Sequence, residues 1–508
     1  MPEKIFPEAA IILCHGIGEH CFPFGGNKAL RPKYAHEVGN IPLVRRIVDE
    51  CVAAGLKKIV IVTGFRSEAI TSLFKERDDR IRLVNVSDYA NGDGNALLEA
   101  LQTLNFEGDA LVINGDLLAF SRDYQNLLDA YRKSGNRSAL LFDELHPEED
   151  KQSWVALTLN KNSDQVERIA GHTADGKFRL SGMAVLSQED IEFLKQSKST
   201  DQPMYLFQML EKMQHPFIAV KSGEPLVHVD RAFDYLEANQ VILKREIDLI
   251  ATAKGAYCYI GGEGDPDPEY IFPGTIITPG ARLVFEEGSF IGPYQTKDAH
   301  VKFARQSRAD VIPIRIRGDV HLKQGARIGL NAIIEGSVVI GTKSYVEDSV
   351  VEAYVLVGSG SEIRRNAVVR GWSVCGDRTR FECGADFEGV AGEGTIYMHP
   401  GQCWIVTGKE CDLGAGNFFG TWRFDSGRCH YRIGGRIIQP KTDSVSNATF
   451  IGDRVRTAIG VFFAPGTRVG ADSLIGAGYL PSGTMEGGFA YLAKQETTKV
   501  RSKLLRKL

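Results

Sequence analysis

A six-residue repeat runs through the second half of the chain and limits what that half can fold into. Apolar residues, with one threonine among them, recur at every sixth position in three runs: Leu322, Ile328, Ile334, Ile340 and Val346; Val351, Val357, Ile363 and Val369; and Ile451, Thr457, Phe463, Val469 and Ile475. Such a repeat is typical of a solenoid in which each short strand turns one side chain inward and three strands complete a coil. A β-sandwich would instead space its strands by ~8–12 residues. Residues 270–485 are therefore predicted to form an all-β parallel β-helix.

The first half of the chain, residues 1–245, alternates strands with helices instead. Short apolar runs such as "AAIIL", "KKIVIVTGF", "GDALVING" and "SALLFD" are typical of buried strands, and apolar residues recur at helical spacing over residues 44–52. This rhythm predicts an α/β domain with a mostly parallel sheet covered by helices. Ligands of such sheets bind beyond the carboxyl ends of the strands, where the glycine-rich stretch after Leu13 lies. Residues 246–269 are predicted to be a linker, and residues 486–508 a basic tail.

Length and composition bound the class of protein. A chain of 508 residues exceeds the size at which one hydrophobic core keeps growing, so at least two domains are expected. The net charge of −4 gives no electrostatic reason to expect nucleic-acid or membrane partners. Nine cysteines without a CxxC pair indicate reduced thiols, and no apolar run reaches the ~18 residues of a membrane span. We therefore expect a cytoplasmic protein that binds neither nucleic acid nor membranes.

The glycine-rich stretch has the composition of an anion-binding loop. It reads "LCHGIGEHCFPFGGNKALRPK" over residues 13–33, directly after an apolar strand. Gly16 and Gly18 let the backbone approach a ligand closely, and their N–H groups can donate to phosphate oxygens. Lys33 adds a cation for the charge that develops at a phosphate under attack. The loop predicts a triphosphate site with Lys33 as a catalytic residue, although structural glycines and a solvated lysine would give the same pattern.

Two aspartates are the candidates for a metal site. Asp116 follows the strand "ALVI" and the dipeptide "NG", and Asp230 stands in "VHVDRAF". Because Mg²⁺ takes one or two carboxylates together with phosphate and water, this pair is predicted to hold Mg²⁺. His228 is the alternative to Asp230 if the register differs by two residues. Either aspartate could equally cap a turn or a helix.

Both halves resemble known families. The first half is similar to the sugar-1-phosphate nucleotidyltransferases: the glycine-rich loop leads to "PK", and "NGDGNALLEAL", "VINGDLL", "RLSGMAVLS" and "VHVDRAFDYLEAN" look like their later nucleotide, metal, sugar and closing segments. The second half resembles the left-handed β-helix acyltransferases, because "YMHPG" precedes "GAG" and "RFD" at their spacing. In this order the two halves resemble the bifunctional N-acetylglucosamine-1-phosphate uridylyltransferase/glucosamine-1-phosphate acetyltransferases. The resemblance implies an α/β Rossmann-like nucleotidyltransferase domain followed by a left-handed parallel β-helix.

The resemblance also implies a reaction and a set of site residues. The first domain would transfer a nucleotidyl group from a nucleoside triphosphate to a sugar 1-phosphate, with Mg²⁺ as cofactor and pyrophosphate as the second product. In the β-helix, His399 stands where the family has the base that takes a proton from the acyl-accepting amine, with acetyl-coenzyme A as donor. Family β-helices form trimers, so a homo-oligomer is implied. The implied binding positions are Leu13, Gly16, Gly18, Glu19, His20, Gly92, Gly94, Asn95 and Gly182 in the first domain, and Gly414, Ala415 and Gly416 in the second.

The chain departs from the family pattern in both halves. Glu19 and His20 stand where the resembled loop has Thr or Ser and then Arg, so a carboxylate and a partly charged imidazole replace a permanent cation. Lys28 and Arg31 could compensate if the loop folds back. Thr421 stands where the acyltransferases tend to have Asn. Three hypotheses therefore stay open: an enzyme with two active sites, an enzyme with one, and a catalytically weak or inactive regulatory subunit that binds nucleotide sugars. The sequence does not identify the nucleobase or the sugar.

Overall fold

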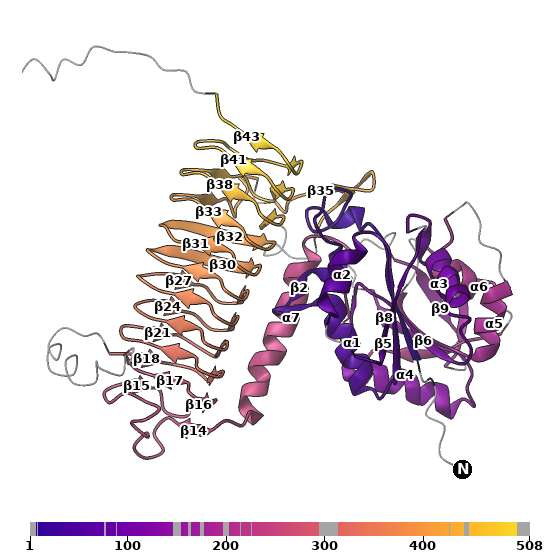
Figure 1. The fold of residues 1–508 in the computed structure, drawn as a ribbon, viewed down its shortest axis with the longest axis horizontal. Helices are drawn as coiled ribbons and strands as arrows, with labels where there is room; N and C mark the ends of the chain where they lie inside the picture. Colours follow the sequence, from indigo (N-terminus) through magenta and orange to yellow (C-terminus); the bar gives the residue numbers. More distant parts are fainter. Residues whose placement is uncertain are drawn as a thin grey trace, which may run out of the picture.

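Two bodies, an α/β domain and a solenoid of stacked short strands, lie against each other along helix α7 (Asp234–Asp248) (Figure 1). The structure is a computed structural model. Among the residues that it describes, no helix has both the length and the apolar character that crossing a membrane requires. The described residues are 7, 9–75, 78–87, 89–145, 154–160, 164–172, 177–196, 203–213, 215–224, 226–293, 313–425, 427–440 and 447–494.

The α/β domain is built on a mixed sheet. Its strands are β1 (Ala9–Cys14), β4 (Lys58–Thr63), β5 (Ile81–Asn85), β6 (Ala110–Asn114), β8 (Ala139–Glu144), β9 (Ala156–Leu159), β10 (Val166–Gly171), β11 (Phe178–Leu186) and β12 (Ile218–Lys221); two ribbons pair β2 (Glu37–Val38) with β3 (Ile41–Pro42) and β7 (Leu117–Leu118) with β13 (Val227–His228). The order is β10-β9-β11-β6-β1-β4-β5, with β8 beside β11 and β12 beside β8. β5, β4, β1 and β6 are parallel, as predicted, whereas β11 runs antiparallel to β6 and β8. The antiparallel flank departs from the predicted mostly parallel sheet, because too few residues separate β9, β10 and β11 for crossover helices.

Helices cover both faces of this sheet. They are α1 (Leu43–Ala53), α2 (Ser67–Leu73), α3 (Gly92–Thr103), α4 (Ser121–Lys133), α5 (Gln188–Gln196), α6 (Leu206–Glu211) and α7, with short 3₁₀ turns η1 (Glu19–Cys21), η2 (Lys33–Ala35) and η4 (Leu249–Thr252). Alternate residues of β1 face the two layers: Ile12 packs in the core with α1, α4 and α7, and Ile11 packs in the core with α3, α5 and α6. The helical spacing predicted over residues 44–52 is found in α1, whose Val44, Ile47 and Val48 are buried. The predicted α/β class of the first half is confirmed.

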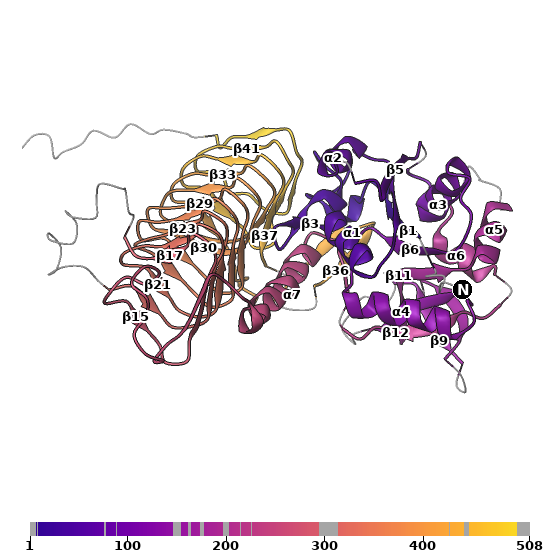
Figure 2. The ribbon, with the colours of Figure 1, turned by 60° about the horizontal axis from the view of Figure 1, so that its bottom comes forward.

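The solenoid is the predicted parallel β-helix, and three faces run along its axis (Figure 2). We call the face toward the α/β domain the docking face; it contains β16 (Arg282–Phe285), β19 (Val320–Leu322), β22 (Val338–Ile340), β25 (Val355–Val357), β28 (Ser373–Cys375), β37 (Thr449–Ile451), β40 (Arg468–Val469) and β42 (Thr484–Met485). The second face contains β15 (Ile276–Ile277), β18 (Arg315–Ile316), β21 (Ile333–Ile334), β24 (Val350–Val351), β27 (Val368–Val369), β34 (Phe418–Phe419) and β39 (Phe462–Phe463), while β30 (Ala385–Ala391) and β32 (Gly401–Thr407) serve both faces. The third face contains β17 (Phe290–Ile291), β20 (Arg327–Ile328), β23 (Tyr345–Val346), β26 (Glu362–Ile363), β29 (Arg380–Phe381), β31 (Ile396–Tyr397), β33 (Asp412–Leu413), β38 (Arg456–Thr457), β41 (Leu474–Ile475) and β43 (Ala490–Tyr491). An insertion between β34 and β37 forms a separate hairpin of β35 (Tyr431–Ile433) and β36 (Arg436–Ile438).

The residues of the six-residue repeat fill the inside of the coils. Thr457 is the most exposed of them at 9%, and Leu322 and Ile328 are fully buried. Equivalent strands of successive coils pair in parallel, and the rings of Phe419 and Phe463 stack with centroids 4.4 Å apart. Stacking the coils therefore buries one continuous column of side chains, which is how a solenoid gains stability.

The predicted linker, residues 246–269, contains regular structure. It holds the end of α7, the turn η4 and the strand β14 (Tyr257–Ile260), which pairs antiparallel with β16. Tyr257 stacks on Tyr270 at 4.7 Å and lies 5.6 Å from the ring of Phe285. This segment therefore covers the open end of the first coil, where a linker would leave apolar side chains in water. Of the predicted basic tail, residues 495–508 lie outside the described part of the chain.

The two bodies share one hydrophobic core. On the docking face, the outward-pointing residues are apolar and at most 8% exposed: Val339, Leu356, Val374, Val390, Val406 and Phe450. They belong to the same buried cluster as the residues of α1, α4 and α7, and α7 packs along β22, β25, β28 and β30. Burying an aliphatic side chain of this size contributes about 1.5–3 kcal/mol. The α/β domain is therefore packed against one face of the β-helix rather than linked to it loosely.

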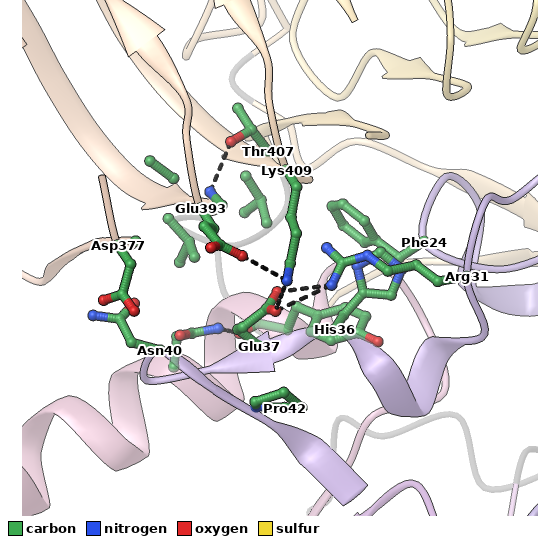
Figure 3. A pocket seen from close by; sticks show the side chains of 17 residues that line it. Phe24, Arg31, His36, Glu37, Asn40, Pro42, Asp377, Glu393, Thr407 and Lys409 are labelled. Atoms are coloured by element: carbon green, nitrogen blue, oxygen red, sulfur yellow. Dashed lines mark hydrogen bonds and ion pairs between the residues drawn. The ribbon is translucent and has the colours of Figure 1, made fainter. Parts of the chain in front are cut away.

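A polar cluster closes this interface next to the glycine-rich segment (Figure 3). Arg31 donates to both carboxylate oxygens of Asp453 at 2.9 and 3.1 Å and to Glu37 at 2.9 Å. Lys409 of the β-helix pairs with Glu37 at 2.6 Å and Glu393 at 2.7 Å. A cavity of about 190 Å³ lies between the two bodies, and its lining includes Arg31, Glu37, Glu393 and Lys409. Burial alone would raise the pKa of the Asp453 carboxyl, but the Arg31 guanidinium outweighs it and lowers that pKa below its ordinary value.

Replacing Asp453 with Asn should destabilise the contact between the two bodies at neutral pH. The change leaves the Arg31 guanidinium buried with one counter-charge fewer, and losing a partner of a buried pair costs about 3–5 kcal/mol. Because the pKa of Asp453 is lowered in the folded protein, its contribution is fully present above the unfolded value of ~4 and is lost progressively as the pH falls from there to the lowered pKa of the folded protein. The midpoint of urea unfolding should therefore drop markedly at about pH 7, and the drop should become progressively smaller as the pH is lowered below ~4.

Asp472→Asn is the matched control. Asp472 makes the same forked pair with Arg454, at 2.8 and 2.7 Å, but both side chains are at least 41% exposed. An exposed pair contributes only about 0–1 kcal/mol. Equal shifts of the unfolding midpoint in the two variants would show that the buried pair stabilises the protein no more than the exposed pair does.

Candidate active site

A cleft opens at the carboxyl ends of β1 and β6, the edge of the sheet at which ligands bind in such folds. Its volume is about 480 Å³. The residues that line it are Leu13, His15, Gly16, Ile17, Gly18, Glu19, Lys33, Tyr34, Tyr89, Ala90, Gly92, Asp93, Asn114, Asp116, Tyr205 and Asp230. The structure thus brings eight of the predicted site residues to one cavity: Leu13, Gly16, Gly18, Glu19, Lys33, Gly92, Asp116 and Asp230.

Lys33 lies between the two aspartates of this cleft. Its Nζ donates to Oδ2 of Asp116 at 2.6 Å and to Oδ1 of Asp230 at 2.9 Å. The side chain of Lys33 is only 5% exposed, whereas those of Asp116 and Asp230 are 20% and 38% exposed. Carboxylates from two distant parts of the chain therefore converge on one positively charged position.

Lys33 and Asp230 each stabilise the charged form of the other. Burial opposes a charge on Lys33, but Asp116 and Asp230 outweigh it and raise the pKa of Lys33 well above its ordinary value. Burial would likewise raise the pKa of Asp230, but Lys33 and then His20 hold it well below the usual range. Lys33 and Asp230 therefore stay charged around neutral pH.

Asp116 reaches the cleft through a tight turn after β6. The N–H of Gly115 donates to the carbonyl of Leu13 at 2.9 Å, so this turn runs directly against the end of β1. A Cβ on Gly115 would lie 2.3 Å from Sγ of Cys14 and 2.7 Å from the carbonyl oxygen of Leu13. Only glycine fits there, which explains why a Gly-Asp pair ends this strand.

Asp230 is held by its neighbours at the start of α7. The N–H of Val229 donates to the carbonyl of Asp116 at 2.8 Å, which joins the two aspartate segments. The carboxyl of Asp234 accepts the N–H groups of Asp230 at 3.0 Å and Arg231 at 2.7 Å. Burial raises the pKa of Asp234 to about 7, although Arg231 opposes the shift. Asp234 therefore fixes the backbone that aims Asp230 into the cleft.

His228, the predicted alternative to Asp230, lies elsewhere. It belongs to β13, its ring is 4.9 Å from that of Trp154, and it is not among the residues that line the cleft. The register that places Asp230 in the cleft is the one that the structure adopts.

The glycine-rich loop passes directly over Lys33. Gly18 has a φ of 67°, and a Cβ on it would lie 3.1 Å from Cδ of Lys33. A Cβ on Gly16 would lie 3.2 Å from the hydroxyl oxygen of Tyr34. A side chain at Gly18 would thus be strained and would crowd the lysine, so the loop needs glycine there.

Lys28 and Arg31, the cations that follow this loop, do not take the place of the arginine that the resembled family has at the position of His20. His20 lies at the rim of the cleft, with Nδ1 3.6 Å from Oδ2 of Asp230 and 48% of its side chain exposed. The loop does not fold back to bring Lys28 and Arg31 to it: Lys28 pairs with Glu486 of the β-helix, and Arg31 with the polar cluster of the interface. Lys28 and Arg31, which could have replaced the arginine of the loop, therefore bind the β-helix instead.

Three further predicted positions lie behind the wall of the cleft. The N–H groups of Gly94 and Asn95 donate to the carbonyl of Met204 at 3.0 and 3.3 Å, in the first turn of α3. Gly182 has a φ of 76°, and a Cβ on it would meet the side-chain nitrogen of Asn114 at 2.8 Å. These residues shape the wall without lining it.

Sequence reasoning missed several lining residues. His15, Asp93 and Asn114 stand within two positions of predicted residues, so proximity in the sequence could have found them. Tyr89 and Tyr205 come from loops without any motif, and only the folded chain brings them to the cleft. Burial and then Lys33 lower the pKa of His15 to about 4, so this imidazole is neutral near pH ~7.

The lining carries an excess of negative charge. The lining contains one lysine, Lys33, and four carboxylates, those of Glu19, Asp93, Asp116 and Asp230, so its formal net charge is −3. Within the described part of the chain, no group of three or more His, Cys, Asp or Glu side chains could hold a metal ion. Two converging carboxylates that leave the other positions to water and phosphate do fit Mg²⁺, which is bound in this way.

The predicted second site lies on the β-helix. His399 is exposed between β31 and β32, and the N–H of Gly416 donates to the carbonyl of Pro400 at 2.8 Å. The "GAG" turn of the next coil therefore lies beside the loop that carries the histidine. Arg423 and Asp425 of the "RFD" run pair with each other at 2.9 Å on the surface.

The other two residues of the "GAG" turn are tied to the following coil. The N–H of Gly414 donates to Oγ1 of Thr457 at 2.9 Å, and the carbonyl of Ala415 accepts the N–H of Gly460 at 2.8 Å. In this single chain, the backbone groups of the turn therefore bind neighbouring coils.

Replacing Lys33 with Met should destabilise the α/β domain by about 3 kcal/mol, at the lower end for a broken buried pair because Asp230 is partly exposed. The change leaves two carboxylates facing each other without a cation. Urea unfolding followed by tryptophan fluorescence measures the loss. Lys28→Met, which removes a lysine from an exposed pair with Glu486, should change stability by at most about 1 kcal/mol. If both variants unfold at the same urea concentration, Lys33 does not neutralise the cluster.

Comparison with known proteins gives matches to both halves. Residues 10–244 match the family model described as the MobA-like NTP transferase domain. The bifunctional protein GlmU of Methanococcus aeolicus is 24% identical over 97% of this chain and 100% of its own length. That of Thermoanaerobacter pseudethanolicus is 23% identical over 96% of both chains. Among solved structures, a UDP-glucose pyrophosphorylase complexed with UDP-glucose has 16% identity and a TM-score of 0.41, over 47% of this chain and 98% of its own.

Proposed function

We propose that this chain, an enzyme of the nucleotidyltransferase type whose residues 10–244 belong to the MobA-like NTP transferase domain family, acts on a sugar 1-phosphate. A phosphate oxygen of the sugar phosphate forms a bond to the α-phosphorus of a nucleoside triphosphate. The bond from the α-phosphorus to the bridging oxygen breaks, and pyrophosphate leaves. The product is a nucleotide sugar.

The resemblance stated from the sequence motifs is confirmed. Both GlmU relatives match nearly the whole chain, so the similarity includes the α/β domain and the β-helix in the same order. Both are named bifunctional proteins.

The observation that carries the proposal is the convergence of Lys33, Asp116 and Asp230 in one cleft at the carboxyl ends of parallel strands. Transfer between two polyanions requires that charge is neutralised and that the attacking and leaving oxygens are aligned. A buried cation beside two converging carboxylates supports both requirements.

Each residue of the cluster has a separate part in this proposal. Asp116 and Asp230 would hold Mg²⁺, which neutralises phosphate charge when it is bound. Lys33 then binds oxygens of the α-phosphate, where negative charge develops during the attack. The backbone N–H groups of Gly16 and Gly18 donate to the phosphate chain.

The net charge of −3 in the cleft favours one alternative, a weak or inactive subunit that binds nucleotide sugars. Glu19 adds a carboxylate to the phosphate loop, and His20 is exposed at the rim. A protein of this kind would bind a nucleotide sugar without releasing pyrophosphate from a triphosphate. Pyrophosphate release therefore distinguishes the two functions, whereas nucleotide-sugar binding does not.

We further propose that the β-helix carries an acyltransferase site at His399. The exposed imidazole would take the proton of an attacking amine while acetyl-coenzyme A donates the acyl group. The contact between Gly416 and Pro400 supports this site, because it places the "GAG" turn beside His399. The exposed rings of Phe418, Trp422 and Phe424 nearby in the sequence support self-association of the β-helix. We propose a trimer because the family that the β-helix resembles forms trimers.

We assign these roles to the predicted divisions of the chain. Nucleotidyl transfer belongs to residues 1–245 and acyl transfer to residues 270–485, with residues 246–269 between them and the basic segment 486–508 at the end. We expect the protein to work in the cytoplasm, where its sugar-phosphate and nucleotide substrates would be available.

The full-length protein should release pyrophosphate from a suitable pair of nucleoside triphosphate and sugar 1-phosphate, and only with Mg²⁺. Asp116→Asn and Lys33→Ala should each lower kcat/KM by at least about 100-fold, since each removes a charge that meets the reacting phosphates. Asp472→Asn, on the surface of the β-helix, should be unchanged. A coupled pyrophosphate assay over a panel of substrates measures these rates. Nucleotide-sugar binding without pyrophosphate release from any pair would support the binding subunit instead.

Acetyl transfer to an amino-sugar phosphate should be lost in His399→Ala. Removal of a general base lowers the rate by about 100- to 10,000-fold. Free thiol released from acetyl-coenzyme A gives the rate directly. His172→Ala, an exposed histidine of the α/β domain, is the matched control. If His399→Ala transfers acetyl groups as fast as His172→Ala, another group is the base.

A further inference from the structure

The imidazole of His15 lies at the wall of the cleft without a hydrogen-bond partner. His15 follows β1 directly, lines the cleft and is 5% exposed. Its Nδ1 is buried and unpaired, and no group in the described part of the chain forms a hydrogen bond with the ring. Because a buried polar side chain without a partner destabilises a fold, His15 indicates a place where a ligand or water supplies the bond.

The ring of His15 offers hydrogen bonds but no charge. Burial and then Lys33 lower the pKa of His15 to about 4, so the imidazole is neutral at about pH 7. A neutral imidazole has one N–H donor and one acceptor nitrogen. It therefore matches a neutral polar group of a ligand, whereas a phosphate is bound more strongly by a charged donor.

His15 lies on the side of β1 that faces away from Asp116. The N–H of Phe65, which follows β4, donates to the carbonyl of His15 at 2.9 Å. A Cβ on Gly64 would lie 3.2 Å from Cβ of His15 and 2.5 Å from Cβ of Tyr89, so these two side chains are neighbours over the end of β4. Asp116 follows β6 instead, and the sheet order places β4 and β6 on opposite sides of β1.

Two tyrosines line the same cleft beyond His15. Tyr89 is half-buried and precedes α3 in the chain, and Tyr205 is 44% exposed. The N–H of Leu206 donates to Oδ1 of Asp93 at 2.8 Å, which holds the segment of Tyr205 at the first turn of α3. Nucleobases stack on aromatic side chains of this kind. A neutral imidazole beside two tyrosines therefore suits a flat, polar heterocycle.

The cleft thus has two parts, as a nucleoside triphosphate has. Lys33, Asp116 and Asp230 form the charged part. If the triphosphate lies there, as the proposed function requires, the neutral base extends past β1 toward His15 and Tyr89.

We propose that His15 is a specificity-determining residue of this site, whose imidazole forms a hydrogen bond with the polar edge of the nucleobase. The inference rests on the proposed function, because it needs the triphosphate to lie beside Lys33. The bond would pair a ring that the protein itself leaves unpaired. It would also make affinity depend on the base, which the charged part of the cleft does not contact.

His15→Ala is the direct test, with inorganic tripolyphosphate as the probe that has no base. Binding of ATP, GTP, CTP, UTP, dTTP and tripolyphosphate, each with Mg²⁺, is measured by calorimetry on the full-length protein. His15→Ala should weaken binding of the most tightly bound nucleoside triphosphate by about 3- to 10-fold, the value of about one hydrogen bond. The affinity for tripolyphosphate should not change.

Two further variants control this test. His15→Gln keeps a hydrogen-bonding side chain of similar volume, so it should lose less affinity for the nucleoside triphosphate than His15→Ala. His172→Ala, which removes an exposed histidine of the same domain, should bind every probe as the unchanged protein does. Urea unfolding of each variant shows whether the fold is kept.

The outcomes separate this inference from the proposed function. A loss of affinity for the nucleoside triphosphate alone supports it, even if no substrate pair releases pyrophosphate. An equal loss for tripolyphosphate overturns it, because His15 would then act on the phosphates or on the loop. Unchanged affinities in His15→Ala overturn it as well, since water would then be the partner of the ring, even if the enzyme is fully active. Failure of the unchanged protein to bind any of the five nucleoside triphosphates would also overturn it.

Discussion

The ion cluster of Lys33, Asp116 and Asp230 is the interaction on which the rest of the site depends. It joins three loops that are far apart in the sequence: the segment after the glycine-rich loop, the turn after β6 and the segment before α7. A lysine that is 5% exposed would lose its charge without such partners, and the aspartates would repel each other without the lysine. The local geometry around the cluster follows from this need, since a glycine turn and the hydrogen bonds accepted by the Asp234 carboxyl aim the two carboxylates at one point.

The same stretch of chain that forms the site also holds the two bodies together. Between Gly18 and Lys33 the segment turns to the β-helix, where Arg31 binds Asp453, and shortly afterwards Asn40 donates to the carbonyl of Cys375 at 3.0 Å. A change in how the bodies dock would therefore move the loop that covers Lys33. The β-helix is therefore not a separate module, because its docking helps to position the loop of the first site.

The sequence predicted what depends on local pattern. The six-residue repeat predicted the β-helix, since the inward positions of successive coils are nearly all apolar and stack on one another, and the helical spacing predicted α1. Lys33 was predicted from the glycine-rich loop, Asp116 from its place after a strand and Asp230 from the segment "VHVDRAF". The three residues meet in one cleft, and their chemical roles stay predictions. The docking face was not predicted. Its outward residues, such as Val339 and Val374, recur only once per coil, and the six-residue repeat of inward residues does not mark them.

What long-range packing decides could not be predicted from the sequence. Lys28 and Arg31 look like phosphate-binding cations beside a glycine-rich loop, and only the position of the β-helix shows that they are used elsewhere. Tyr89 and Tyr205 enter the cleft from loops without a signature. The approach of Gly434 to His20 joins positions more than four hundred residues apart, which no local pattern could indicate.

A crystal structure of the full-length protein with Mg²⁺ and a non-hydrolysable nucleoside triphosphate tests the central claim most directly. We expect the metal between the carboxylates of Asp116 and Asp230, and the ammonium of Lys33 on an oxygen of the α-phosphate. A nucleotide bound elsewhere, with Lys33 still held between the two aspartates, would contradict the account.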